Sequence, residues 1–297
     1  MPKKFLTTFI VLAVLIAVFF LLSYQKKVSM VSNEEIKTVS DEPVTFLVLG
    51  KTGKVIGWNR APELADAILI VDYHPKLGVL NLVSLPRDLW FDFGNESMKL
   101  NEVVRQNKIT GLLNQLPDIT GIQTDKYIVV DIDILKGVVD ALDGIDLDLK
   151  EKAVDWVSGY TIEAGQRHLN GEQVIWLVRN RFAPEGDFFR EKNQHEVIQA
   201  IIDKYKKMNA IEKATFMFKM APEVTKLQTN MDFQKLLPFL EKIGNIRFND
   251  VVLDFQTNLL LSSSTPMGTS SAYILLPRLG ENDYSEIKNF IDGKLEK

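Results

Sequence analysis

The sequence predicts an α/β protein with a mixed central sheet covered by helices on both faces, a three-layer αβα arrangement preceded by one transmembrane helix. Residues 5–24 form an almost unbroken apolar run without charge, which is long enough to span a bilayer core. The continuous apolar runs at 44–50 and 79–85 are typical of strands buried on both faces. Beyond them, strand-like and helix-like segments alternate without internal repeats.

The N-terminus predicts the compartment. Residues 1–4 form a short basic tail, residues 5–24 the membrane anchor, residues 25–42 a polar linker and residues 43–297 one globular domain. A cleaved signal peptide is the alternative, but the apolar run is longer than the usual hydrophobic region of a signal peptide, and no small-residue cleavage site follows it. We therefore expect a single-pass protein of the cell membrane, with a cytoplasmic tail and an extracytoplasmic domain.

Three predicted strands open the domain, at residues 44–50, 66–73 and 79–85. His74–Gly78 has the composition of a turn between the second and third. Apolar spacing and cap residues, such as Asn170, then predict helices mixed with strands. We expect helices at 100–116, 134–142, 171–179, 188–208, 211–220, 231–244 and 283–292, and strands at 126–131, 251–255 and 272–276.

Composition excludes several function classes. The net charge of −4 gives no general basic surface for nucleic acid. The absence of cysteine excludes disulfides, thiol catalysis and cysteine-bound metals. His74, His168 and His195 are too scattered in sequence to predict a zinc site. We expect the two later histidines to lie on the surface.

Arginine is rare and clustered. Of nine arginines, four fall in three short segments, Ser84–Asp88, Val178–Arg181 and Gly186–Arg190. A planar guanidinium binds two phosphate oxygens at once, so a lysine-rich chain that keeps arginine for these segments favours an oxyanion site. The alternative for each arginine is a surface ion pair of little energetic value.

The neighbours of these arginines extend the hypothesis. Arg190 and Gln194 are four residues apart, so they share one face of the expected helix, near the end whose dipole favours an anion. Aromatic residues beside the charges would suit a ligand with a phosphate head and an apolar tail, although such residues more often belong to the core. They are Trp90, Phe91, Phe182, Phe188 and Phe189. Asp88 has the alternative role of capping the turn after a strand.

In motif order and spacing the chain resembles the LytR-CpsA-Psr family of cell-envelope phosphotransferases, from about Val44 to Lys204. The anchor also fits this family. The matching motifs are Leu82–Asp88, Lys99–Asn101, Tyr127–Asp131, Val139–Asp148, Gly165–Gln173, Val178–Arg181 and Gly186–Arg190 with Gln194.

The resemblance implies a reaction and its participants. Members transfer a glycopolymer such as teichoic acid, with its phosphate, from a polyprenyl-pyrophosphate carrier to a hydroxyl of peptidoglycan. The site would hold the pyrophosphate through arginines and a Mg²⁺ ion through carboxylates near the first two strands, and Asp66 and Asp88 are the candidates for removing the acceptor's proton. The residues implied for the pyrophosphate are Arg87, Arg179, Arg181, Arg190 and Gln194.

Two positions depart from the family pattern. Thr52 stands where the family has a metal-binding aspartate, and Leu64 where it has an arginine. Asp66 then remains as the one carboxylate for the metal, which puts metal dependence in doubt more than lipid binding. The alternative functions are a catalytically weak, anchored polyprenyl-phosphate-binding protein and a polyprenyl pyrophosphatase. Transcriptional control is disfavoured by the anchor and the acidic balance.

Overall fold

A computed structural model describes residues 42–51, 64–93, 96–154, 159–179, 196–197, 200–201, 203–205, 207–224, 226–231, 247–253, 257–267 and 270–297. Its contacts divide into two compact units. We name them the sheet unit (the described residues of Val39–Val130, Gln228–Met231 and Glu241–Lys297) and the helical unit (those of Asp131–Leu227). The single domain expected from the sequence stays a prediction.

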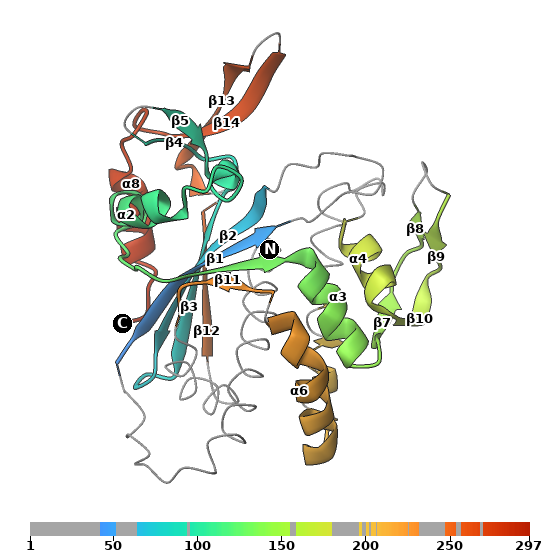
Figure 1. The fold of residues 1–297 in the computed structure, drawn as a ribbon. Coiled ribbons are helices and arrows are strands. Elements are labelled where there is room, and N and C mark those ends of the chain that lie inside the picture. The colour runs from blue at the N-terminus through green and yellow to red at the C-terminus, as the bar shows by residue number, and fades with distance from the viewer. Residues whose placement is uncertain are drawn as a thin grey trace. The chain divides into compact units, whose positions relative to one another are not determined.

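The sheet unit is built on a mixed six-stranded sheet in the order β11-β6-β1-β2-β3-β12 (Figure 1). The first three strands pair antiparallel in chain order, and β12 joins β3 in parallel. The predicted strands 44–50, 66–73, 79–85 and 126–131 are confirmed within one residue at each end. The strands are β1 (Val44–Lys51), β2 (Ala65–His74), β3 (Val79–Leu85), β6 (Tyr127–Asp131), β11 (Gln228–Thr229) and β12 (Arg247–Val252).

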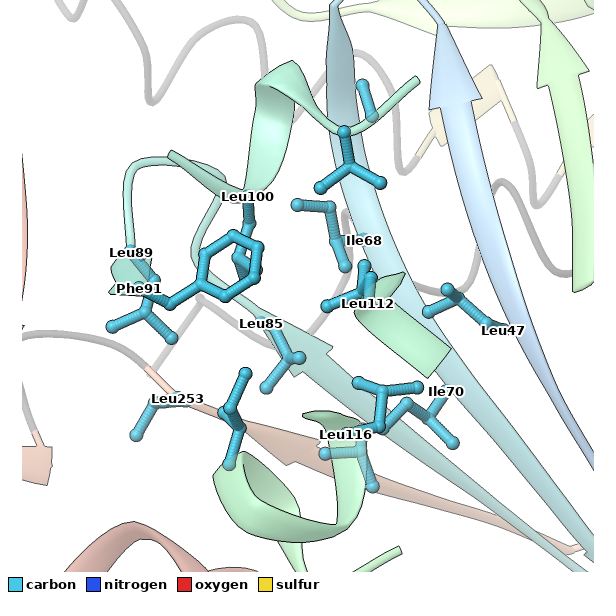
Figure 2. Packing of buried hydrophobic residues seen from close by; sticks show 14 of the residues in the cluster. Leu47, Ile68, Ile70, Leu85, Leu89, Phe91, Leu100, Leu112, Leu116 and Leu253 are labelled. Atoms are coloured by element: carbon cyan, nitrogen blue, oxygen red, sulfur yellow. The ribbon is translucent and has the colours of Figure 1, made fainter. Parts of the chain in front are cut away.

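One face of this sheet packs on a hydrophobic cluster that holds the unit together. Leu47, Ile68 and Leu85 of the sheet meet Leu112 and Leu116 of α2 (Ile109–Thr120) in this cluster (Figure 2). Ile287 and Ile291 of α8 (Ser285–Asp292) complete it from the C-terminal end of the chain. The burial of these side chains, at about 1.5–3 kcal/mol each, is the main stabilising contribution to the unit.

The opposite face of the sheet is also buried. Phe46, Val48 and Val71, which alternate with the residues of the cluster, are completely buried. Burial of both faces explains why these strands are continuous apolar runs instead of alternating ones. The predicted α/β class with a mixed sheet is thus confirmed, and the full three-layer arrangement stays a prediction.

The predicted helix at 100–116 is wrong in its first half. A short 3-10 helix, η1 (Leu100–Glu102), is followed by turns, and α2 begins only at Ile109. Asn107 has a φ of 55°, a left-handed conformation that asparagine tolerates and a helix does not contain. The amides of Leu100 and Asn101 donate to the carbonyls of Leu89 and Arg87, so the first turn is bound to the loop after β3.

Two strand pairs complete the sheet unit, and the sequence predicted only one of their four strands, in part. β4 (Trp90–Asp92) pairs with β5 (Ser97–Lys99), and β13 (Leu260–Met267) forms a hairpin with β14 (Ser270–Pro277). The strand expected at 272–276 is the central part of β14, and the strand expected at 251–255 is β12, which begins earlier. In Figure 1 the β13–β14 hairpin projects beyond β4 and β5.

In the helical unit, α3 (Ile132–Ala141) packs against both α4 (Gly171–Arg179) and α6 (Ala210–Val224) (Figure 1). The helices expected at 134–142, 171–179 and 211–220 are confirmed, each within a few residues. Asn170 caps α4 as predicted, because its Oδ1 accepts from the amide of Gln173 while the Gln173 side chain accepts from the amide of Asn170. The unit also contains β7 (Ile145–Leu149), β8 (Ala153–Val154), β9 (Thr161–Ile162) and β10 (Gly165–Leu169).

The described helices include none that is long and apolar enough to cross a membrane. The anchor predicted at residues 5–24, and most of the helices predicted at 188–208 and 231–244, lie outside the described residues.

Candidate functional site

The site begins with the turn that follows β3. The carbonyl of Pro86 accepts from the amide of Leu89 at 3.1 Å and closes a turn with Arg87 and Asp88 at its centre. Both central carbonyls are held by other elements: that of Arg87 accepts from the amide of Asn101 at 3.0 Å, and that of Asp88 from the amide of Leu275 at 2.9 Å. The turn is therefore a fixed platform for its two charged side chains.

Asp88 joins two cations on this platform. Its Oδ1 accepts from Lys99 Nζ at 2.9 Å and its Oδ2 from Arg87 Nε at 3.3 Å. Asp88 and Lys99 are 17% and 16% exposed, whereas the Arg87 side chain is 38% exposed. The partly buried carboxylate orients a guanidinium that solvent and ligand can reach. Lys99 belongs to a motif that the sequence singled out, but its pairing with Asp88 was not predicted.

Asp66 lies at the same end of the sheet as this turn. The β2–β3 register pairs Ile68 with Leu85, the last residue of β3, so Asp66 and Arg87 each lie two residues beyond that pair. The backbone of Asp66 falls at an irregularity of the β1–β2 ladder, where Gly50 pairs with Ala67 and Lys51 with Ala65. Bulges of this kind are common beside active sites, because they redirect a side chain at the end of a strand.

Asn101 is a further polar residue beside the turn. Its side chain is 4% exposed, and its Oδ1 is buried without a hydrogen-bond donor in the described structure. An unsatisfied buried acceptor costs about 1–3 kcal/mol, so Asn101 is a further candidate residue of the site beside Arg87.

The aromatic neighbours of the turn divide into two groups. Phe91 is 1% exposed and packs on Phe93 with a ring-centroid distance of 4.3 Å, so it belongs to the core and the ligand-wall hypothesis is wrong for it. Trp90 is partly exposed and lies opposite Lys99 in the β4–β5 pair. Tyr284 Oη donates to the carbonyl of Trp90 at 3.2 Å, and burial raises the pKa of this tyrosine.

The other predicted phosphate ligands are described only in part. Arg179 is the last residue of α4 in the helical unit, and its side chain lies outside the described part. Thr52, Arg181, Arg190 and Gln194 also lie outside the described residues. The gathering of the four arginines around one pyrophosphate therefore stays a prediction.

The helical unit contains two further charged arrangements. As predicted, His168 lies on the surface, and its Nδ1 is 2.7 Å from Asp146 Oδ1 across the β7–β10 pair. This hydrogen bond holds the pKa of Asp146 below its usual value. A pocket of about 520 Å³ lies beside α3 and α6, and its lining carries charges of both signs, including Lys136, Asp140 and Glu223.

A second polar cluster lies at the opposite end of β2 and β3. Asp72 is 8% exposed, accepts from Thr45 at 2.8 Å and from Asn81 at 3.1 Å, and contacts His74 Nε2 at 2.8 Å. Asn81 also bonds both the amide and the carbonyl of Glu296, each at 3.0 Å. Its hydrogen bonds show that the cluster holds the C-terminal segment against the sheet. The sequence did not predict this cluster, because its members are isolated polar residues in apolar strands.

The described residues contain no group of three acidic or histidine side chains that could hold a metal ion. Asp88 is engaged by Arg87 and Lys99, and Asp72 by its own cluster. The side chain of Asp66 lies outside the described part of the structure, so its role as a magnesium ligand stays a prediction.

Comparison with known proteins identifies the family. A model of the LytR_cpsA_psr family matches residues 19–264, most of the chain. The chain belongs to the LytR-CpsA-Psr family. It is 29% identical over 176 residues to a polyisoprenyl-teichoic acid–peptidoglycan teichoic acid transferase, TagU, of Bacillus mycoides, covering 58% of this chain and 55% of that protein. It is 28% identical over 207 residues to TagV of Bacillus subtilis, covering 66% of this chain and 52% of that protein.

Thus the chain spans about half the length of these curated relatives. Solved structures agree on the fold. TagV of Bacillus subtilis superposes with a TM-score of 0.58 at 21% identity, covering 86% of this chain and 98% of that one. A structure titled "TagT bound to LIIa-WTA" gives a TM-score of 0.59 at 20% identity, covering 89% and 94%. The sheet unit and helical unit are thus parts of a LytR-CpsA-Psr fold.

Proposed function

We propose that the protein transfers a glycopolymer with its phosphate from a polyprenyl-pyrophosphate carrier to a hydroxyl of peptidoglycan, as a membrane-anchored enzyme acting outside the cell. The observation that carries the proposal is the Arg87–Asp88–Lys99 arrangement at the end of β3, in a chain of this family. The names of the related TagU and TagV proteins, teichoic acid–peptidoglycan transferases, support this class of substrates.

The reaction is a phosphoryl transfer. The acceptor hydroxyl attacks the phosphorus that carries the glycan, its O–P bond forms, the bridging P–O bond breaks, and polyprenyl phosphate leaves with the electron pair. Such transfers depend on positioning and on neutralising the phosphate oxygens. Arg87, held by Asp88, would bind the pyrophosphate together with Arg179, Arg181, Arg190 and Gln194.

Asp66 and Asp88 have different expected roles. Asp88 uses one oxygen for each of two cations, so we assign it to positioning Arg87. Asp66 would accept the proton of the acceptor hydroxyl or act as the protein ligand of Mg²⁺. When bound, Mg²⁺ would supply charge neutralisation at the phosphate oxygens, with water and substrate oxygens completing its ligands.

Donor binding tests the proposal. The full chain in detergent micelles is titrated with polyprenyl pyrophosphate, beside Arg87→Ala and the control Arg105→Ala. Arg105 also pairs with a carboxylate, Glu102, and lies on the surface of the same unit. We expect Arg87→Ala to weaken binding at least about tenfold through lost charge-assisted bonds, and Arg105→Ala to leave it unchanged. Equal binding by both variants would contradict the proposal.

A second candidate function is an anchored polyprenyl-phosphate-binding protein with little turnover. The threonine at position 52 and the leucine at position 64 favour it, because the family has a metal-binding aspartate and an arginine there. If this is the function, the wild type binds the donor without turning it over, and Thr52→Asp raises turnover. Full turnover by the wild type with Mg²⁺ would exclude this candidate.

A further inference from the structure

The β13–β14 hairpin is the least charged part of the sheet unit. No charged residue occurs from Thr257 to Pro277, although a quarter of the whole chain is charged. Exposed strand edges normally carry charges that prevent unwanted strand pairing. An uncharged, projecting hairpin is therefore unusual for a surface that contacts water alone, and indicates a ligand without charge at the contact.

One face of the hairpin changes from apolar to hydroxyl-bearing along its length. The register places Leu260 opposite Pro277 and Ser264 opposite Tyr273, with Ser262 and Leu275 paired between them on the same face. Leu260 and Leu275 are buried in the hydrophobic cluster. Farther out, Ser262 and Ser264 are exposed, Tyr273 is 46% exposed, and Ser262 Oγ lies 3.4 Å from Tyr273 Oη. We name Ser262, Ser264 and Tyr273 the hydroxyl strip.

The hydroxyl strip is continuous with the candidate site within the same unit. Leu275 bridges to Leu89, and its amide donates to the carbonyl of Asp88 at 2.9 Å. Tyr273 lies two residues before Leu275 in β14, which corresponds to about 7 Å at the rise of an antiparallel strand. A ligand lying along the strip would thus end at the turn that carries Arg87 and Asp88.

The chemistry of the strip fits the uncharged hydroxyl groups of a sugar chain. Each hydroxyl both donates and accepts a hydrogen bond, as the hydroxyls of a saccharide do. The tyrosine ring adds an apolar face, with a polar tip, against which a sugar ring can pack.

The family match ends at residue 264, so β14, which supplies Tyr273, lies outside the segment that the family model covers.

We infer that the hydroxyl strip binds the glycan chain of the acceptor and aligns its reacting hydroxyl with the Arg87–Asp88 turn. This inference rests on the proposed transferase function and assigns its acceptor subsite.

A binding titration tests the inference. The full chain in detergent micelles is titrated with an uncrosslinked peptidoglycan glycan oligomer of alternating N-acetylglucosamine and N-acetylmuramic acid, without donor. Tyr273→Ala is expected to weaken binding about tenfold, as truncation of a central aromatic contact does. Tyr273→Phe, which keeps the ring, is expected to lose less. Leu279→Ser is the control, because Leu279 is 53% exposed and lies outside both strands.

The outcomes separate this inference from the proposed function. Failure of the wild type to bind the oligomer, or equal binding by Tyr273→Ala, would overturn the assignment of the strip. A dimer in sedimentation that Tyr273→Ala dissociates, without glycan binding, would instead identify the hairpin as a contact between two copies of the chain. The proposed function has its own readout, donor binding by Arg87→Ala, which the strip variants leave unchanged.

Discussion

At the scale of single residues, Asp88 orients the side chain of Arg87. One carboxylate on a fixed turn pairs with two cations and orients them, and the more exposed cation is Arg87. A lysine at position 87 would lack the planar fork that binds two phosphate oxygens. The platform therefore depends on the identity of both residues and on the turn that carries them.

Replacing Asp88 by asparagine tests its positioning role. The variant removes the charge that holds Arg87 and Lys99, so we expect donor turnover to fall about tenfold or more and the affinity for polyprenyl pyrophosphate to fall with it. Steady-state kinetics and titration of the full chain measure both. Asp118→Asn is the matched control, since Asp118 is 84% exposed in the same unit. Unchanged donor affinity in Asp88→Asn would contradict the positioning role.

The candidate site was predictable in part at this scale. The rarity of arginine and the segment Ser84–Asp88 pointed to the end of the third predicted strand. The structure places Arg87 and Asp88 in the turn after β3, at the same end of the sheet as the backbone of Asp66. The partner of Asp88, Lys99, could not be derived from spacing, because the β4–β5 pair that brings it back to the turn is only three residues long on each side. The orphan Oδ1 of Asn101 depends on packing and has no sequence signal.

At the scale of elements, the continuous apolar strands were predictable, and the short strands and the serine-rich β13 were not. β1 and β3 are continuous apolar runs, so their period and length identify them. β13 is rich in serine and contains Pro266, so it has neither a continuous apolar run nor charged alternation. The error at 100–108 has a similar origin, because apolar residues at helical spacing are buried there by a turn bound to the site.

The stability of a Gly144 variant tests the close packing between the β7–β10 pair and the turn after α3. It has a φ of 78°, and a Cβ there would lie 2.4 Å from the ring of His168 and 2.9 Å from the carbonyl of Leu169. Gly121 has a φ of 77° with open space around it. We expect Gly121→Ala to cost about 1–2 kcal/mol from backbone strain and Gly144→Ala at least about 1 kcal/mol more from the clash. Urea unfolding compares them, and equal losses would contradict the predicted clash.

The Asp72 cluster bonds the C-terminal segment to the sheet, so we expect it to contribute to the free energy of unfolding. We expect Asp72→Ala to destabilise the protein by about 3 kcal/mol, because it removes one carboxylate that bonds three buried or partly buried side chains. Urea unfolding of the full chain measures the loss, with Asp125→Ala as the control at a carboxylate that is 87% exposed. A loss below about 0.5 kcal/mol would show that the cluster does not hold the sheet and the C-terminal segment together.

At the scale of the whole molecule, the chain has the fold of its family. The proposed reaction is assigned to the end of the sheet that carries Arg87 and Asp88. The α/β class followed from the alternation of elements, and membership of the LytR-CpsA-Psr family is shown by the match over residues 19–264. The division into two compact units had no sequence signal, because no linker composition separates them.

The most direct test of the central claim is a transfer assay. The full chain is incubated with a synthetic polyprenyl-pyrophosphoryl saccharide and a peptidoglycan oligomer, with and without Mg²⁺, beside Arg87→Ala and Arg105→Ala. The account predicts a product joined through phosphate that Arg105→Ala still forms and Arg87→Ala does not. Equal product from Arg87→Ala, or donor binding by the wild type without any product, would contradict the proposed transferase.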